Sequence, residues 1–317
     1  MNIAILGSGT FGTALANVIT PEREVTLYTI ESDVVEDINI NQRNTKYFPN
    51  KLLGKNIHAT DRFADIADAD LVFVAIPSHV LVNVFTQKQF RKDTIIVNGA
   101  KGFAKENLLI SRFLQKLLPE NPVCAIKGPS FANELIFELP TAFTIASPTQ
   151  EAYHKIVGTL RKDLIVTDYS NDIDAVEYMS VIKNVYAIVI GVVDAYYNSS
   201  NVRFLVFTKV LNEIRRLLQY FGVNPEILFY YCGIGDFGLT ALNDLSRNRT
   251  LGLLIGRGFF DANLPNSVLL EGVRAMNDII GSISEKEQEN YLILHQMQLL
   301  LQNKIKVKNF LNRIIFG

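Results

Sequence analysis

The chain has 317 residues, of which 48% are hydrophobic, and its 31 Lys and Arg nearly balance its 32 Asp and Glu. At roughly 150 residues per domain, this length predicts two domains, each large enough to bury a core. The formal net charge of -1 gives no support to a nucleic-acid partner bound through overall charge.

Cysteine use and hydropathy exclude further classes. Cys124 and Cys232 lie too far apart to form a disulfide framework or a Cys-x-x-Cys metal site, which favours a reducing compartment. The most apolar run, 185–193, is well short of the ~20 residues that cross a bilayer. The apolar start of the chain lacks a basic leader and is interrupted by glycines, unlike a signal peptide. We therefore expect a cytoplasmic protein without a metal site or membrane insertion.

The first half of the chain alternates short β-type runs with helical patterns. Helical spacing of apolar residues occurs at 11–19, 34–40, 80–85 and 107–118. The predicted strands cover 2–6, 25–29, 57–60, 71–76, 94–98, 124–126 and 141–146. Several of these strands are continuously apolar, as in parallel strands covered on both faces. The alternation predicts an α/β fold with a doubly wound sheet.

Helical patterns replace the β-type runs from about residue 172. They cover 175–197, 202–221, 225–232, 246–256, 268–282 and 285–302. We expect an α/β domain over 1–170 and an all-α domain over 171–317. The basic C-terminal segment, with no acidic residue after Glu289, is interpreted as a solvated surface, with a partner or anion contact as the alternative.

A glycine motif follows the first predicted strand and opens the first predicted helix. It fits G-x-G-x-x-G and consists of Gly7, Ser8, Gly9, Thr10, Phe11 and Gly12. In this context Gly7 allows a tight turn, Gly9 lets the backbone approach a pyrophosphate, and Gly12 permits close packing of helix on strand. Amide groups at the helix start would stabilise the phosphate charge. The motif predicts a Rossmann-type dinucleotide site; the alternative is a glycine-rich turn without a ligand.

An acid near the end of the second predicted strand indicates which dinucleotide binds. Glu31 comes 19 residues after Gly12, where a carboxylate accepts hydrogen bonds from the adenosine ribose hydroxyls. The same carboxylate would repel a 2′-phosphate, and no arginine stands at this strand end. The sequence therefore favours NAD over NADP.

Two loops after later strands point to the same cleft. Ligands of open α/β sheets bind beyond the carboxyl ends of the strands. We therefore expect Pro77 and Ser78, after the fourth strand, to line the nicotinamide side. Lys101, after the fifth strand, would project a cation into the same space, although a solvated loop lysine is the alternative.

The helical half carries charged groups suited to chemistry on a small anion. Lys183 interrupts an apolar helix. Desolvation there would lower the pKa of the lysine toward the range useful for proton transfer. A lysine that reaches along the helix to solvent is the alternative. Asp236, which follows Gly233 and Gly235, would hold such an ammonium in place. Arg247 and Asn248, at a predicted helix start, offer a guanidinium and an amide to a phosphate.

These motifs together resemble those of NAD(P)-dependent glycerol-3-phosphate dehydrogenases. The matching segments run in the same order over nearly the whole chain: 7–12, 44–49 (NTKYFP), 77–78, 101–102, 128–132 (GPSFA), 140–142, 183–184 (KN), 235–236 (GD), 246–248 (SRN) and 271–272 (EG). The resemblance implies reversible reduction of dihydroxyacetone phosphate to sn-glycerol 3-phosphate by NAD(P)H, which supplies glycerophospholipid synthesis. It also implies a homodimer formed through the helical domain.

The resemblance also implies residue roles, matched by position. Lys183 would be the catalytic acid/base, supported by Lys101 and Asp236. Substrate contacts would be Lys101, Ser130, Lys183, Asn201, Thr208, Asp236, Ser246, Arg247 and Asn248. Further cofactor contacts would be Lys101, Ala132, Arg247 and Glu271.

Departures from the family pattern leave two alternatives open. Larger side chains occupy 177–181 and 229–232, Thr-Lys-Val stands at 208–210, the family's acid after Lys101-Gly102 is replaced in 103–106, and Ile30 replaces an arginine. Such changes would narrow the pocket or shift substrate preference. The alternatives are a dehydrogenase of another small polyol or sugar phosphate, and a catalytically weak NAD-binding regulatory protein.

Overall fold

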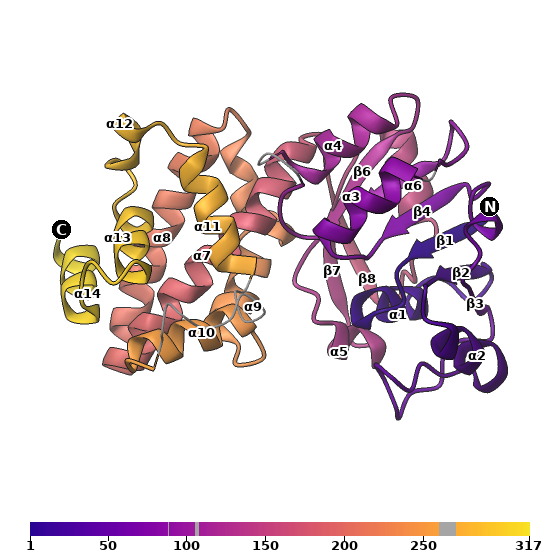
Figure 1. Cartoon of the computed structure of the whole chain (residues 1–317), viewed down its shortest axis with the longest axis horizontal. Helices are drawn as coiled ribbons and strands as arrows, with labels where there is room; N and C mark the ends of the chain where they lie inside the picture. Colours follow the sequence, from indigo (N-terminus) through magenta and orange to yellow (C-terminus); the bar gives the residue numbers. More distant parts are fainter. Residues whose placement is uncertain (88, 105–107, 260–270) are drawn as a thin grey trace. The chain divides into compact units, whose positions relative to one another are not determined.

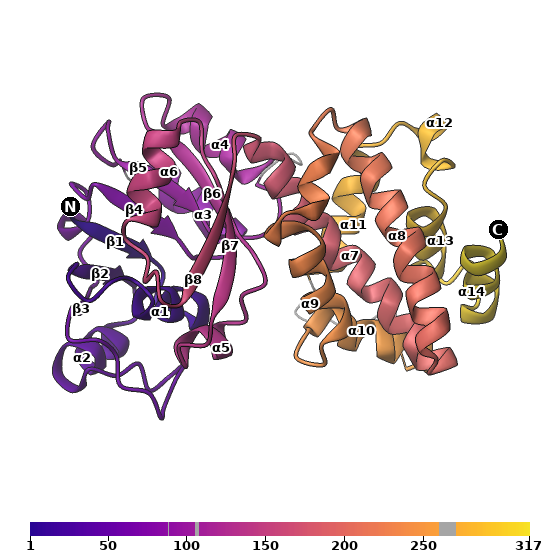
Figure 2. The ribbon, with the colours of Figure 1, turned by 180° about the vertical axis from the view of Figure 1, so that it is seen from behind.

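The computed structural model describes residues 1–87, 89–104, 108–259 and 271–317, without the side chains of His79 and Glu271. The chain divides into two units, Met1–Glu177 and Tyr178–Gly317. Figures 1 and 2 show the first unit as a sheet with helices and the second as a set of helices. The starts of two predicted helices, at 107 and 268, lie outside the described residues.

The first unit is built on eight strands. They are β1 (Ile3–Leu6), β2 (Val25–Tyr28), β3 (Ile57–Thr60), β4 (Leu71–Val74), β5 (Ile95–Asn98), β6 (Val123–Lys127), β7 (Thr141–Ala146) and β8 (Ile165–Ser170). The helices between them are α1 (Thr10–Asn17), α2 (Ser32–Asn41), the 3₁₀ turn η1 (Phe63–Asp65), α3 (Ser78–Gln87), α4 (Ile110–Leu117), α5 (Ala132–Ile136) and α6 (Gln150–Val157).

The strand order is β3-β2-β1-β4-β5-β6-β7-β8. Strands β1 to β6 are parallel, whereas β7 pairs antiparallel with β6 and parallel with β8. The predicted doubly wound Rossmann-type sheet is confirmed, with an opposite direction at one edge. The prediction missed β8, because this edge strand is half exposed and carries polar residues such as Asp168.

Alternate strand residues face two helical layers. Ile3 and Ile5 of β1 belong to a core cluster formed with α1, α2, α5 and α6, whereas Ala4 and Leu6 belong to a cluster formed with α3 and α4. Burial on both faces explains why β1, β4 and β5 read as continuously apolar runs. The buried polar residues Asn98 and Lys127 lie at the last positions of β5 and β6.

The second unit is all-α over its described residues, as predicted. Its elements are α7 (Ile173–Tyr197, which begins in the first unit), α8 (Ser200–Tyr220), the 3₁₀ helix η3 (Pro225–Phe229), the π-helical turn η4 (Tyr231–Gly235), α9 (Asp236–Leu242), α10 (Arg247–Gly256), α11 (Glu271–Gly281), α12 (Glu285–Gln288), α13 (Leu292–Leu301) and α14 (Val307–Phe316). The predicted helices 225–232 and 285–302 are each divided in two.

Helix α7 forms the centre of the second unit. It is long and apolar enough to cross a bilayer by length and composition, but 94% of its most apolar window is buried inside the fold. Such burial is typical of the core helix of a bundle, and the nine-residue apolar run 185–193 is its middle.

A buried glutamate joins three helices of this unit. Glu213 on α8 accepts hydrogen bonds from the backbone amides of Ile293 (2.9 Å) and Leu294 (2.8 Å) at the start of α13, and from the Tyr186 hydroxyl on α7 (2.8 Å). Burial raises the pKa of Glu213, and these donors oppose that rise. The carboxyl group therefore satisfies amides that the start of α13 cannot pair within its own helix.

Helices α7 and α10 cross at glycines. A Cβ atom on Gly252 of α10 would lie 2.1 Å from the Ile188 carbonyl oxygen and 2.8 Å from the Gly191 Cα atom. One on Gly191 would lie 2.4 Å from the Arg249 carbonyl oxygen. Only glycine at both positions allows the two backbones to approach this closely.

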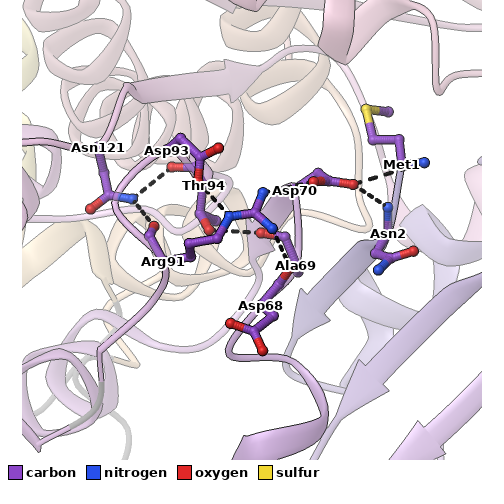
Figure 3. A network of polar contacts seen from close by, with 9 residues as sticks. All are labelled: Met1, Asn2, Asp68, Ala69, Asp70, Arg91, Asp93, Thr94 and Asn121. Atoms are coloured by element: carbon purple, nitrogen blue, oxygen red, sulfur yellow. Dashed lines mark hydrogen bonds and ion pairs between the residues drawn. The ribbon is translucent and has the colours of Figure 1, made fainter.

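A polar network lies at the amino ends of the central strands, opposite the predicted site (Figure 3). Asp70, before β4, accepts hydrogen bonds from the Asn2 amide (2.6 Å) and from Arg91 (2.7 Å). The Arg91 guanidinium holds the pKa of Asp70 below its usual range. Asp68 contributes its backbone carbonyl, which accepts from Arg91 at 3.2 Å. These contacts fasten the start of β1 to the loops that precede β4 and β5.

Replacing Gly252 tests the helix crossing. We expect Gly252→Ala to lower the free energy of unfolding by about 1–3 kcal/mol, because the added methyl overpacks a backbone contact. Gly238→Ala on α9 is the matched control: its Cβ would meet nothing within 4 Å, so we expect no loss and a gain of up to about 1 kcal/mol. Chemical denaturation of both variants measures the difference, and equal stabilities would contradict the close crossing.

Replacing Asp70 tests the strand-end network. Because the folded-state pKa of Asp70 is lowered, its charge stabilises the fold at neutral pH, and this stabilisation is lost as the pH falls through that lowered pKa. Asp70→Asn should therefore cost about 0.5–1 kcal/mol at pH 7 and progressively less in acid. Asp68→Asn, which leaves the Arg91 contact to the Asp68 carbonyl intact, should change little. Urea titrations at several pH values test both; a pH-independent deficit would refute the assignment.

Candidate functional site

The glycine turn between β1 and α1 has the backbone geometry of a phosphate-binding loop. Gly7 has a φ of +114°, and a Cβ there would lie 2.8 Å from the Ala75 carbonyl oxygen. A Cβ on Gly12 would lie 2.0 Å from the Gly7 carbonyl oxygen. A Cβ on Gly9 would meet no atom within 4 Å, so the space beside Gly9 is open. Two glycines thus permit the tight turn, and the third faces open space at the start of α1.

A buried asparagine supports this turn from a distant segment. The Asn44 amide nitrogen donates to the Ser8 carbonyl and to the Thr13 hydroxyl, both at 2.8 Å. Thr13 in turn donates to the same Ser8 carbonyl at 2.9 Å. The Ser8 hydroxyl and the Asn44 side-chain oxygen are buried without a hydrogen-bond partner in the described chain. Open space beside Gly9 and the unused Ser8 hydroxyl, which can donate to a phosphate oxygen, fit a bound pyrophosphate.

Glu31 lies at the carboxyl end of β2 and immediately precedes α2. Its carboxylate forms an ion pair with Lys46 and accepts a hydrogen bond from the Tyr47 hydroxyl at 3.0 Å. Both partners come from the NTKYFP segment. The acid expected to face the ribose therefore carries a lysine and a phenol beside it, which sequence spacing did not indicate.

A buried network holds the loop that precedes Lys101. Asn98, at the end of β5, accepts from the Ala100 amide at 2.9 Å and donates to Glu177. The Lys127 ammonium, at the end of β6, donates to the carbonyls of Asn98 (3.1 Å) and Ala100. Both charged side chains are buried. Lys101 itself is exposed, so a fixed loop carries a solvent-accessible cation.

The remaining predicted residues of the first unit lie after neighbouring strands. Pro77 precedes α3, which begins at Ser78 after β4. Ser130 follows β6 and its hydroxyl donates to the Gly128 carbonyl at 3.1 Å, and Ala132 begins α5. Because β1 to β6 are parallel, these positions share one edge of the sheet with the glycine turn.

Lys183 and Asp236 form a buried ion pair in the second unit. Lys183, on α7, has a side-chain exposure of 0%, and Asp236 has one of 5%. Asp236 is the first residue of α9, directly after the π-helical turn η4. That turn bends at Gly233, whose ψ of -114° is non-helical and whose Cβ would lie 2.2 Å from the Leu228 carbonyl oxygen. The bend at Gly233 thus brings the Asp236 carboxylate to the Lys183 ammonium.

Three of the matched segments converge on an asparagine pair. The Asn248 amide donates to the Asn184 side-chain oxygen at 3.0 Å, and the Gly272 backbone amide donates to Asn248 at 3.2 Å. A Cβ on Gly272 would lie 2.7 Å from Asn248 and 2.8 Å from the Asn184 carbonyl oxygen. These contacts fix α7, α10 and α11 beside one another. The structure describes the backbone of Glu271 at the start of α11, but its side chain lies outside the description.

The first turn of α10 carries one exposed arginine and one buried arginine. The Ser246 hydroxyl accepts from the Arg249 amide at 3.3 Å and so caps the helix. Arg249 is buried and forms ion pairs with Asp194 and with Asp244 (3.1 Å). Arg247, in contrast, is exposed at the first position of the helix. Its guanidinium is therefore available to an anion while Arg249 anchors the helix.

Asn201 and Thr208 lie two turns apart at exposed positions of α8. The Thr208 hydroxyl donates to the Phe204 carbonyl of its own helix at 2.9 Å. Within the described residues, no hydrogen bond or ion pair joins either side chain to Asp236 or Arg247. The contacts of this unit thus bring Lys183 to Asp236 and Asn248 to Asn184, and leave Asn201 and Thr208 outside that group.

The residues that depart from the family pattern before Lys183 pack against other residues of the fold. Tyr178 stacks on Phe221 with ring centroids 4.4 Å apart, and Met179 and Val181 are buried. Glu177 accepts from the Ser111 amide and hydroxyl, both at 2.9 Å. These larger side chains have packing partners of their own.

Comparison with known families accounts for both halves of this arrangement. Residues 2–153 match the family model for the N-terminus of NAD-dependent glycerol-3-phosphate dehydrogenase, and residues 172–312 match the model for its C-terminus. The chain belongs to this family. The resemblance drawn from the sequence motifs is confirmed.

Individual relatives match over most of their lengths. The glycerol-3-phosphate dehydrogenase (NAD(P)+) of Methanothermobacter thermautotrophicus is 33% identical over 88% of this chain and 87% of its own. That of Myxococcus xanthus is 36% identical over 81% and 79%. The crystal structure of the Coxiella burnetii glycerol-3-phosphate dehydrogenase is similar with a TM-score of 0.87 and 28% identity, covering 100% of this chain and 99% of that one.

Family membership leaves several residues that sequence spacing alone did not single out. Asn44 and Lys46 contact the predicted site residues Ser8 and Glu31. Lys127 and Glu177 contact Asn98, in the loop that leads to Lys101. A polar residue in an otherwise apolar context, such as Lys127 at the end of β6, was the available signal. Its meaning depended on which neighbouring loop it reached.

Proposed function

We propose that this chain catalyses the reversible reduction of dihydroxyacetone phosphate to sn-glycerol 3-phosphate with NAD(P)H, which supplies a precursor of glycerophospholipids. The observation that carries the proposal is the buried Lys183–Asp236 ion pair, found in a chain that matches both domains of the family. A buried ammonium held by one carboxylate is suited to proton transfer with a substrate oxygen.

The glycine turn, with Glu31, Pro77 and Ser78, would hold the dinucleotide. The amides at the start of α1 would meet its pyrophosphate, and Glu31 its adenosine ribose. When bound, the nicotinamide supplies the hydride that reduces the ketone. Ala132, Glu271 and Arg247 are proposed as further cofactor contacts from their matched positions.

Lys183 would deliver a proton to the oxygen of the ketone, and take it back in the reverse direction. Asp236 holds the ammonium in position and balances its charge while the group is buried. Lys101, on its fixed loop, would add positive charge that stabilises the developing alkoxide.

Recognition of the substrate phosphate would depend on the start of α10. The exposed Arg247 guanidinium presents a fork of donors to a phosphate dianion, and the helix amides add to its field. Further proposed substrate contacts, from matched positions, are Ser130, Asn201, Thr208, Ser246 and Asn248. The side-chain oxygen of Asn248 accepts from Gly272, and one of its two amide hydrogens is donated to Asn184. The second amide hydrogen would make the contact to substrate.

Neither alternative function is favoured. A dehydrogenase of another polyol phosphate would be expected from a remodelled pocket, but Met179 and Val181 are buried and the half-buried Tyr178 stacks on Phe221. Relatives that match this chain along most of its length are named as dehydrogenases, which argues against a binding protein without activity. Both alternatives remain distinguishable by turnover with dihydroxyacetone phosphate.

Replacing Lys183 tests the proposed chemistry. With NADH and dihydroxyacetone phosphate, Lys183→Ala should lower kcat by about 10²–10⁴-fold, the usual worth of a positioned acid, while the Kd for NADH stays within about twofold. Steady-state oxidation of NADH and fluorescence titration measure the two quantities. Retention of most activity would exclude Lys183 as the proton donor. If wild type binds NADH but no phosphorylated ketone drives turnover, the regulatory alternative is correct.

The Lys183→Ala result needs a folding control, since it leaves Asp236 buried without its ion-pair partner, a change that can cost several kcal/mol. The double variant Lys183→Met with Asp236→Asn removes both charges together. It should regain thermal stability toward wild type and stay inactive. Recovered activity in this variant would show that the single substitution acted through folding.

We also propose that the chain works in the cytoplasm as a homodimer. The support is its family membership together with two buried cysteines that form no disulfide. Sedimentation velocity of the purified chain should give about twice the 35.6 kDa mass of one chain; a single 35.6 kDa species at micromolar concentration would exclude the dimer.

A further inference from the structure

We propose that Lys46 sets the choice between NADH and NADPH, by neutralising Glu31 and by offering its ammonium to the 2′-phosphate of NADPH. This rests on the proposed function only in that the glycine turn binds a dinucleotide. Its consequence differs from the expectation based on Glu31 alone, which is a preference for NADH over NADPH. With Lys46 in place, both dinucleotides should be accepted.

The contacts around Glu31 carry the inference. One carboxylate oxygen pairs with the Lys46 ammonium and the other accepts from the Tyr47 hydroxyl. The Glu31 side chain is 27% exposed and that of Lys46 is 48% exposed, so both reach solvent where a ribose would lie beyond β2. The hydrogen bond to Glu31 raises the pKa of Lys46, so its charge persists through the neutral range. The net charge of the pair is therefore zero.

Lys46 is held at this place by contacts of the two residues that precede it. Two residues before it, Asn44 is buried against the Ser8 carbonyl of the glycine turn. The amide of Thr45 donates to Asp37 of α2 at 2.7 Å. The segment thus connects the phosphate turn to the helix that Glu31 precedes, and Lys46 begins from a fixed point beside both.

Electrostatics then predicts how each dinucleotide is bound. An unpaired carboxylate beside the ribose accepts its hydroxyls and repels a phosphate dianion. A lysine ammonium on the same site has three donors and binds a phosphate well, while its flexible stem lets it exchange one anion for another. With NADH, Lys46 would stay on Glu31; with NADPH, it would turn to the 2′-phosphate. Glu31 therefore favours NADH, and Lys46 reduces that preference by also accepting NADPH.

Substitutions at the pair test this balance. The ratio of kcat/KM for NADH to that for NADPH should rise by about tenfold in Lys46→Gln, the effect of losing one charged hydrogen-bond partner of the phosphate. Glu31→Gln should lower the same ratio. Lys51→Gln is the matched control, because Lys51 follows this segment in the chain and pairs with a different carboxylate, that of Glu138, at 3.1 Å. We expect it to leave the ratio unchanged.

A binding measurement separates this inference from the proposed reaction. Isothermal titration with 2′,5′-ADP and with 5′-AMP needs no ketone substrate and reports the 2′-phosphate directly. Lys46→Gln should weaken 2′,5′-ADP about tenfold and change 5′-AMP less than twofold. If the affinity ratio of the two nucleotides stays within twofold of wild type, the role of Lys46 is refuted. If the ratio shifts while dihydroxyacetone phosphate is not turned over, the inference stands and the proposed reaction is wrong.

Discussion

The burial of a single ammonium group is the constraint on which the second unit depends. Lys183 has no exposure to solvent, and removing such a charge from water is tolerable only when a carboxylate lies against it. Asp236 reaches it because the chain bends at Gly233 and starts a new helix at the aspartate. The bend at Gly233, the short helix α9 and the long core helix α7 therefore meet at this one ion pair.

The same helix carries a second constraint one residue further along. Asn184 joins Asn248 and Gly272 by hydrogen bonds, and the glycine crossing of α7 with α10 brings these groups within reach. Close backbone packing, which needs glycine, thereby places the Arg247 end of α10. Packing and polar contacts therefore act on the same pair of helices.

The first unit handles charge in another way. The glycine turn offers backbone amides and open space to a phosphate, so it needs no cation of its own. The nearby lysines are of two kinds. Lys127 is buried against the carbonyls of the loop before Lys101, whereas Lys101 and Lys46 reach solvent. A chain with a net charge of -1 can therefore meet anionic ligands through a few placed groups.

The sequence by itself determined the elements whose signal is local. Strands buried on both faces are continuously apolar, and the glycine turn is defined by backbone conformation within six residues, so both were predictable. The strand β8 was not, because an exposed edge strand has a weak apolar pattern. Only the tertiary structure decided that Glu31 has Lys46 and Tyr47 beside it, that Asn44 supports the turn, and that Lys127 and Glu177 hold the β5 loop. Each of these contacts joins segments far apart in the chain, and the energy of burying or pairing a charge depends on what lies across from it.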